Sequence, residues 1–139
     1  MNVNKNKTLE ELEKSYWGFA PDGVSFLVTR IHQIRKKTLN DLTIEDLRIT
    51  IGQNLSLELL IPIAIDILKQ NILAEGDLYE GDLLQNVFNL NIEFWKDNYD
   101  YWFSIKQLFE TNKRLFDERE HRQILKSFKR FEEIHYGKH

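Results

Sequence analysis

The chain has 139 residues, 42% of them hydrophobic and 29% charged, with no cysteine and a formal net charge of −3. This length supports one domain with its own core, and the scarcity of glycine and proline favours helix. The lack of cysteine excludes disulfides and thiolate metal sites. Residues 1–7 are polar and unlike a secretory signal, and the longest apolar run, at 57–68, is too short to span a membrane, so we expect a cytoplasmic protein with no membrane partner.

Charge is distributed unevenly along the chain. Residues 38–105 hold twelve acids and three bases, whereas residues 106–139 hold nine bases and six acids. Proteins that bind nucleic acid concentrate bases where they meet phosphate, so the acidic middle argues against direct nucleic-acid binding. An acid excess favours a cationic partner, although charged residues commonly do no more than solvate a surface.

The N-terminal third predicts two helices. Residues 1–7 are expected to be disordered, and Thr8 caps a helix that should end near Gly18. Ser25 or a neighbour starts a second helix, which runs through about Lys37 and collects bases at its C-terminal end, where cations favour the helix dipole.

The most apolar segment follows. Thr43 and Asp46 form a capping box for a helix that should end at Gly52, and Ser56 is the next cap candidate. Between residues 57 and 68 the three positions that are not aliphatic recur every fourth residue, so they share one stripe of an otherwise apolar helix. The middle one, Pro62, predicts a kink or a restart near Ile61.

Two Gly-Asp pairs follow in the stretch Glu75 to Asp82. Glycine can adopt positive φ and aspartate can cap the N–H groups after it, so each pair predicts a turn. The acids do not have the spacing of an EF-hand calcium loop, and we expect no metal here. A short helix should then run from Leu83 to Leu90.

Aromatic residues dominate the last third. Five of them recur every seven residues, which predicts a buried seam against the central helix: Phe88, Trp95, Trp102, Phe109 and Phe116. Asp117 should cap a final helix through about Ile134. The whole pattern predicts an all-α fold, in which residues 1–139 form a single compact multi-helix domain of about six to seven helices around a central apolar helix near residues 57–70.

No constellation of catalytic residues emerges. The four histidines do not form a His-Glu-x-x-His motif, and there is no Gly-rich phosphate loop, nucleophile elbow or cysteine nucleophile. An acid pair such as Glu75 with Asp77 has no partner residue in sequence reach. We therefore expect no enzyme, no catalytic residues, no cofactor and no metal.

Three stretches resemble a known family. They are Leu-Thr-Ile-Glu-Asp-Leu-Arg-Ile-Thr-Ile-Gly-Gln at 42–53, the apolar run with its proline at 59–68, and Glu-Gly-Asp-Leu-Tyr-Glu-Gly-Asp-Leu-Leu at 75–84. They are similar to the immunity proteins of bacterial contact-dependent growth inhibition systems, the CdiI-type. Thr8-Leu-Glu-Glu-Leu-Glu, Tyr16-Trp17-Gly18 and Arg35-Lys36-Lys37-Thr38-Leu39 resemble the same family, so the resemblance covers about residues 8–90.

The resemblance implies a small cytoplasmic protein that binds and neutralises a cognate toxin domain of the CdiA C-terminal type, often a nuclease. It supplies no catalytic residues, and its motif residues are expected to be structural. Nuclease toxins bind phosphate and tend to be basic, which suits an acidic immunity surface. We place the candidate partner-binding surface at seven acids: Glu75, Asp77, Glu80, Asp82, Glu93, Asp97 and Asp100.

Two other hypotheses remain open at this point. A helical adaptor or regulator would bind another protein through the aromatic C-terminal half, which requires several of Trp95, Tyr99, Tyr101 and Trp102 to lie together on the surface. A nucleic-acid module would use the bases Lys126, Lys129 and Arg130 of the last helix. The sequence leaves the oligomeric state open.

Overall fold

Helix is the only regular secondary structure in residues 3–135, the part of the chain that the computed structural model describes. The predicted all-α fold is confirmed, with eight α-helices in these residues where about six to seven were expected. They are α1 (Leu9–Glu13), α2 (Phe26–Arg35), α3 (Ile44–Gly52), α4 (Leu57–Gln70), α5 (Asp82–Phe88), α6 (Ile92–Lys96), α7 (Tyr99–Thr111) and α8 (Arg122–Glu133). Two short 3₁₀ helices, η1 (Leu39–Asp41) and η2 (Lys113–Leu115), complete the set.

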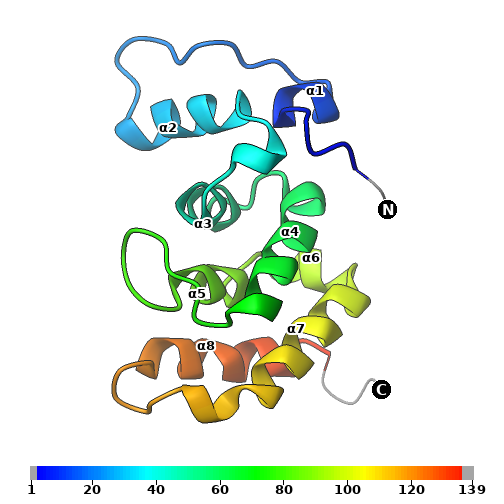
Figure 1. The fold of residues 1–139 in the computed structure, drawn as a ribbon, viewed down its shortest axis with the longest axis vertical. Coiled ribbons are helices and arrows are strands. Elements are labelled where there is room, and N and C mark those ends of the chain that lie inside the picture. The colour runs from blue at the N-terminus through cyan, green and yellow to red at the C-terminus, as the bar shows by residue number, and fades with distance from the viewer. Residues whose placement is uncertain (1–2, 136–139) are drawn as a thin grey trace.

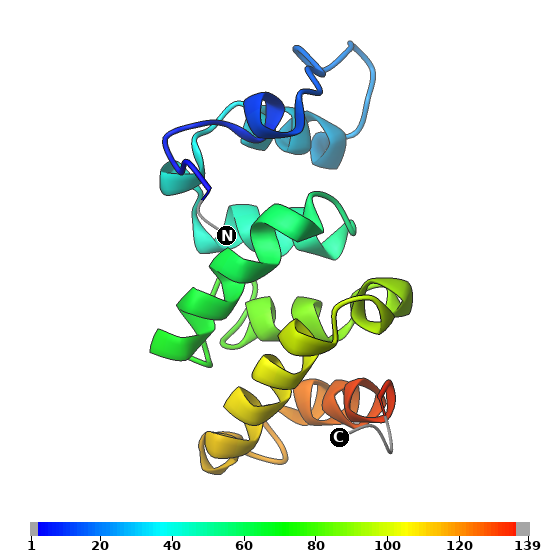
Figure 2. The ribbon, with the colours of Figure 1, turned by 90° about the vertical axis from the view of Figure 1, so that its right-hand side faces the viewer.

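The helices stack along the long axis of the molecule. Figure 1 shows α2, α3, α5 and α8 one below another, and each packs against the next. Helices α4 and α7 pack against each other and lie on one side of this stack, the side that faces the viewer in Figure 2. The connections before α2, before α5 and before α8 all project to the opposite side (Figure 1).

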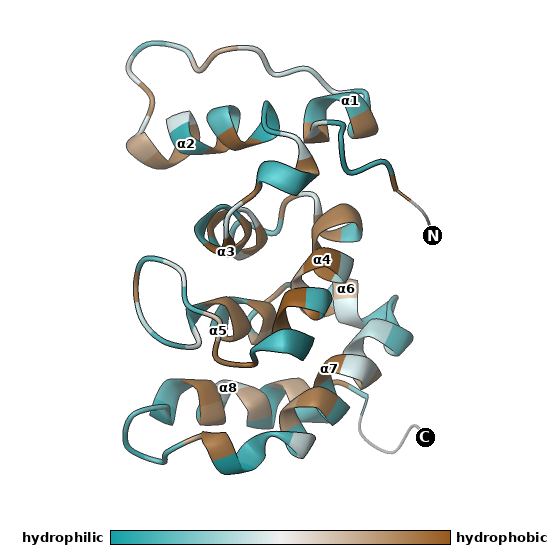
Figure 3. Cartoon of the chain, in the orientation of Figure 1, coloured by the Kyte–Doolittle hydropathy of each residue, from teal (hydrophilic) through white to brown (hydrophobic). Residues whose placement is uncertain are grey.

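Helix α4 is the central apolar helix that the sequence predicts. Glu58 and Asp66 are exposed and Pro62 is partly buried, so the predicted stripe lies outward. In Figure 3 most of α4 is brown, the colour of hydrophobic residues, and its last turn is teal, the colour of hydrophilic ones. The helix is continuous through Pro62, and the restart near Ile61 does not occur. Its inward side is fully buried: Leu60, Ile61, Ala64, Ile65 and Leu68.

Four of the five aromatic residues spaced by seven are core, as predicted, and the fifth, Phe116, is partly buried. Trp95, Trp102 and Phe109 have at most 1% of their surface exposed, and Phe88 has 4%. The Phe88 and Phe109 ring centroids lie 5.5 Å apart, and Trp102 Nε1 donates to the Phe131 carbonyl at 2.7 Å. Trp95 and Trp102 are buried and Tyr99 and Tyr101 are partly buried, so these four residues do not form the exposed aromatic surface that the adaptor hypothesis requires.

The helix ends follow their capping residues. The capping boxes at Thr8 and Thr43 are present, and α3 ends at Gly52 as predicted. Helix α1 stops at Glu13 instead of near Gly18, because Lys14 adopts the left-handed conformation and closes the helix. Ser56 precedes α4 as expected, but its side chain makes no capping bond.

The segment expected to be disordered divides into two parts. Met1 and Asn2 lie outside the described residues. The carbonyls of Lys5 and Lys7 accept hydrogen bonds from the backbone of Asn40 and Leu39, so the following residues are joined to η1. Within residues 3–135, no helix combines the length and the apolar character that crossing a membrane requires.

Candidate functional site

The connection between α4 and α5 ends in residues 75–81, called here the acidic loop, and Asp82 holds it from within. The Asp82 side chain is 1% exposed. Its carboxylate accepts backbone N–H bonds from Gly76 at 2.6 Å, Leu78 at 3.0 Å and Tyr79 at 3.3 Å. Because hydrogen bonds to an ionised acceptor are stronger than neutral ones, this one carboxylate fixes the path of the loop.

A second buried carboxylate ties the acidic loop to α3. Glu45 accepts the Asp77 backbone N–H at 2.9 Å and two bonds of 2.6 Å from the Arg48 guanidinium. The bonds from Arg48 lower the pKa of Glu45 below its ordinary value, so the carboxylate is ionised at neutral pH. Arg48 Nε also lies 3.7 Å from Asp82, which links the two carboxylates that hold the loop.

The two glycines of the acidic loop serve different purposes. Gly81 has a φ of +86°, the left-handed region that glycine was predicted to supply, and a Cβ there would lie 2.6 Å from Ile124. Gly76 does not have a positive φ. It is needed because a Cβ would lie 2.6 Å from the Glu45 carboxylate and 3.2 Å from that of Asp82.

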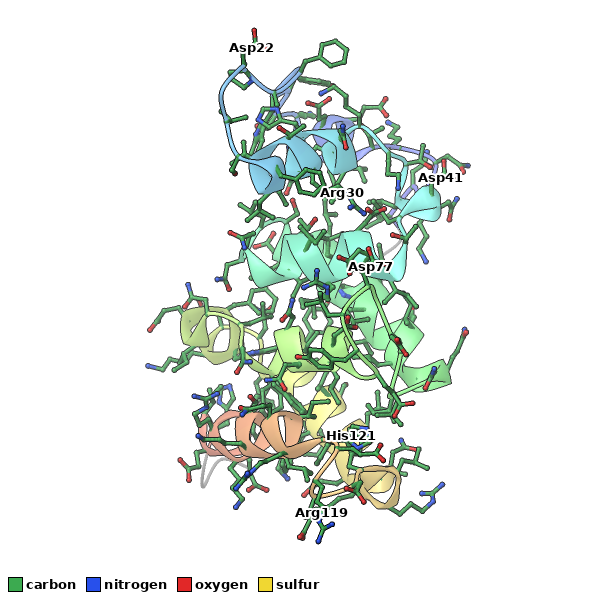
Figure 4. The ribbon with its side chains drawn as sticks, turned by 90° about the vertical axis from the view of Figure 1, so that its left-hand side faces the viewer. Asp22, Arg30, Asp41, Asp77, Arg119 and His121 are labelled. Atoms are coloured by element: carbon green, nitrogen blue, oxygen red, sulfur yellow. The ribbon has the colours of Figure 1, made fainter. Side chains whose placement is uncertain are left out.

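A buried histidine joins the acidic loop to the last helix. His121 is 6% exposed, and its Nδ1 accepts the Asp117 backbone N–H at 2.9 Å. The proton of the neutral ring is therefore on Nε2, which donates to Glu80 at 3.0 Å. Figure 4 shows His121 below the loop that carries Asp77.

Glu80 and His121, together with Glu120, form a group among the described residues that could hold a metal ion. Ligand atoms of Glu80, Glu120 and His121 lie within 4.8 Å of one another. A metal at His121 Nε2 would displace the proton to Nδ1, which already accepts the N–H of Asp117. The donor set therefore suits a hydrogen bond between His121 and Glu80 better than a cation.

The structure divides the seven predicted acids into two exposed groups and one buried residue. Glu75, Asp77 and Glu80 are exposed on the acidic loop at the N-terminal end of α5. The other group is exposed around α6, which follows the C-terminal end of α5: Glu93, Asp97 and Asp100. The seven acids therefore do not form a single patch.

Asp82 needs a correction. It was predicted as a surface acid whose side chain caps the N–H groups after it, but it is buried and its carboxylate bonds to residues that precede it. Sequence spacing alone does not distinguish these directions, because both use an aspartate that follows a glycine.

Asp117 was also expected to cap α8. It accepts the N–H groups of Arg119 and Glu120 in the preceding turn instead, and α8 begins at Arg122.

The acidic loop also exposes apolar side chains that the sequence analysis did not single out. Leu78 is 62% exposed and Tyr79 is 44% exposed. Partial burial raises the pKa of the Tyr79 hydroxyl, a group that is uncharged at neutral pH even at its ordinary pKa. A loop that combines acids with apolar side chains has the composition of a protein-binding surface, in which apolar groups fill the centre and polar groups form the rim.

A second exposed apolar surface lies at one end of the molecule, in the connection between α1 and α2 and in the first turn of α2 (Figure 1). It is called here the aromatic segment, and its exposed residues are Tyr16, Trp17, Phe19, Val24, Phe26, Leu27 and Val28. A cavity of about 440 Å³ lies beside it, lined by residues that include Phe19, His32 and Lys36. The only charged residue between residues 16 and 28 is Asp22, so this surface lacks the acid excess of the acidic loop.

The bases around α2 are structural. Arg30 and Lys37 lie 3.1 and 2.6 Å from the Asp46 carboxylate, which is itself buried. Arg35 is 3% exposed, donates to Glu13 at 2.6 Å and lies over the Trp17 ring. These contacts explain why the basic stretch at 35–37 accompanies the capping box: the bases neutralise carboxylates of α1 and α3.

Comparison with known proteins gives one match. The family model for CDI immunity proteins, those of contact-dependent growth inhibition, matches residues 11–105. This range includes α2 to α6, the acidic loop and the aromatic segment. Neither the curated proteins nor the solved structures contain a match.

Proposed function

Because the chain belongs to the family of CDI immunity proteins, we propose that it binds one cognate toxin domain of the CdiA C-terminal type and neutralises it in the cytoplasm. The protein acts as a stoichiometric inhibitor and not as an enzyme. The toxin domain is proposed to be a nuclease, whose phosphate-binding surface is basic.

The observation that carries this proposal is the acidic loop. Glu75, Asp77 and Glu80 are exposed, and no base occurs between residues 71 and 81. The backbone of the loop is bonded to Asp82 and Glu45, so the acids are held in place before a partner arrives. Binding to such a surface costs less ordering entropy than binding to a mobile loop.

The second exposed group, Glu93, Asp97 and Asp100, extends the acidic character to α6 and the start of α7. We propose it as a secondary contact, which adds to the long-range attraction of a basic toxin. Attraction of this kind accelerates association more than it strengthens the final complex, and it weakens as salt screens the charges.

The test is titration calorimetry with the toxin domain encoded directly upstream, followed by kinetics of association at low and high salt. The double variant Glu75→Gln/Asp77→Asn removes two loop charges without touching the bonds of Asp82. We expect it to slow association several-fold at low salt, with a smaller difference at high salt.

The matched control is Glu58→Gln/Asp66→Asn, which removes the same two charges from the exposed stripe of α4, on the other side of the stack. It should leave association close to that of the wild type. Equal slowing by both double variants would mean that net charge alone matters and that the loop is not the contact.

A further inference from the structure

Leu78 and Tyr79 are the most exposed apolar side chains of the acidic loop. Their exposed fractions of 62% and 44% mean that water covers a large part of two side chains that would gain from burial. Isolated exposed apolar residues are common on protein surfaces and need no explanation. What distinguishes this pair is the way in which the chain holds it.

The backbone N–H groups of both residues are bonded to Asp82, and the flanking N–H groups of Gly76 and Asp77 are bonded to Asp82 and Glu45. The Tyr79 carbonyl accepts the Asp82 N–H at 3.0 Å, and the Gly81 N–H donates to Leu73 at 3.2 Å. Glu80 is fixed to His121. Every residue from Gly76 to Gly81 therefore makes at least one hydrogen bond that restrains the loop.

This arrangement uses buried charge to support exposed apolar surface. Asp82 and Glu45 are both buried, and burying carboxylates carries a desolvation cost that is offset here by backbone N–H groups and by Arg48. Leu78 is 62% exposed and Tyr79 is 44% exposed, so the buried carboxylates hold a loop whose two apolar side chains remain in large part outside the core. Such a cost is expected where a surface must be presented in one conformation.

Charge on the same loop defines the partner. Glu75, Asp77 and Glu80 are exposed acids in the same loop as the pair, and Arg48 of α3 is turned inward to Glu45. On the α8 side, Arg119 and Arg122 line the cavity beside Tyr79, so the negative charge lies on the loop side of the pair. A complementary surface is basic and has an apolar recess at its centre. The loop lies on the side of the molecule that Figure 4 presents, with Asp77 labelled at its outer part.

We infer that Leu78 and Tyr79 form the apolar anchor of the interface, seated in an apolar recess of the basic surface of the toxin domain, with the loop acids on the basic rim. This inference rests on the proposed function and adds the residues that supply most of the affinity. Interfaces concentrate their energy in a few rigid, central side chains, among which tyrosine is enriched.

The experiment measures the affinity of the full chain for the toxin domain encoded directly upstream, by calorimetry at high salt, where the effect of the charges is weak. Leu78→Ala and Tyr79→Ala are each expected to weaken binding at least 30-fold, the order typical of an anchor residue. Binding kinetics measure the association and dissociation rates separately. We expect both variants to dissociate faster than the wild type, with little change in their association rates.

Two controls make the result specific. Leu115→Ala removes an apolar side chain of matched exposure, 46%, from η2, outside the region that the family model matches. It should bind like the wild type. The second control is urea unfolding of each variant. Leu78→Ala should unfold at the urea midpoint of the wild type, because the Leu78 side chain is mainly solvated.

The aromatic segment supplies the competing surface. In the double variant Phe19→Ala/Phe26→Ala, two residues exposed by 89% and 81% are truncated. A loss of affinity in this variant with no loss in Leu78→Ala and Tyr79→Ala would overturn the inference. Loss in both sets would keep the anchor and extend the interface to the aromatic segment.

The experiment distinguishes a failure of the inference from a failure of the proposed function. If the wild-type protein does not bind the toxin domain, the proposed function fails and the anchor fails with it. If the wild type binds and the two loop variants bind equally well, the proposed function stands and the anchor alone is refuted.

Discussion

Replacing Asp82 by asparagine tests whether one buried carboxylate holds the acidic loop. The substitution keeps the size of the side chain but turns one acceptor oxygen into an NH₂ group. The two carboxylate oxygens serve three backbone N–H groups, those of Gly76, Leu78 and Tyr79. At least one of these donors therefore loses its acceptor and faces another donor instead.

The expected cost follows from these bonds. Each bond to a charged acceptor contributes about 1.5–3 kcal/mol, and those that remain drop to about 0.5–1.5 kcal/mol because the acceptor is neutral. Arg48 loses its 3.7 Å contact with Asp82 but keeps its two bonds to Glu45, so no buried charge is left alone. We therefore expect Asp82→Asn to lower the free energy of unfolding by about 2–4 kcal/mol.

Urea unfolding followed by circular dichroism measures this cost. With an m-value of about 2 kcal/mol/M, the midpoint should fall by about 1–2 M. Hydrogen exchange should show that the amides of Gly76, Leu78 and Tyr79 lose protection before other amides. The control is Asp77→Asn, an exposed carboxylate in the same loop, which should change stability by less than about 0.5 kcal/mol. Equal stability of the two variants would refute the role of Asp82.

Three further predictions concern the scaffold. Burial alone would raise the pKa of Asp46, but the bonds that its carboxylate accepts from basic and backbone neighbours lower it. The ionised carboxylate therefore stabilises the fold fully above the ordinary pKa near 3.8, and this stabilisation is lost as the pH falls below it. We expect acid unfolding to be less steep in Asp46→Asn. Gly81→Ala forces a non-glycine residue into positive φ and against Ile124, so thermal unfolding should show a loss of at least about 1–2 kcal/mol, whereas an unchanged melting temperature would contradict the geometry. Trp102→Phe removes the indole bond to the Phe131 carbonyl, which keeps the Ile134 N–H at 3.2 Å, so urea unfolding should show a loss of about 0.5–1.5 kcal/mol from this bond; a stability equal to that of the wild type would mean that the bond is not made.

Periodicity was sufficient to predict the helical scaffold. The spacing of Glu58, Pro62 and Asp66 identified the outward stripe of α4, and the seven-residue spacing of aromatics identified the buried seam. The first pattern reports which side of one helix faces the core, which is a local property. The position of Thr43 identified the start of α3 for the same reason, since a capping box lies within four residues. The aromatic residues lie on three helices, α5, α6 and α7, so their common burial also depends on how these helices pack together.

The interior of the candidate site could not be predicted in the same way. The bond between Glu45 and the Asp77 N–H joins residues 32 positions apart, and that between Glu80 and His121 joins residues 41 positions apart. Neither spacing belongs to a helix, so no pattern reveals it. The same limit explains Asp82: its charge suggested a surface, while its burial depends on how α5 packs against α3.

The exposed apolar residues were missed for a different reason. Leu78 follows an aspartate and precedes a tyrosine in a stretch that looks like a turn, and an isolated leucine in a turn carries no signal of exposure. Its significance arises only when the bonds of the surrounding backbone are known. An acidic loop with a leucine and an aromatic residue between its two glycines is the sequence signal that could have indicated it.

The central claim, that this protein neutralises a contact-dependent growth inhibition toxin, is tested most directly in growing cells. The toxin domain encoded directly upstream is expressed from an inducible promoter, with and without the protein. We predict that growth stops when the toxin domain is expressed alone and continues when the protein is present at equal or greater amount. Growth arrest that is equally complete in both cultures, with the protein expressed and folded, would contradict the account.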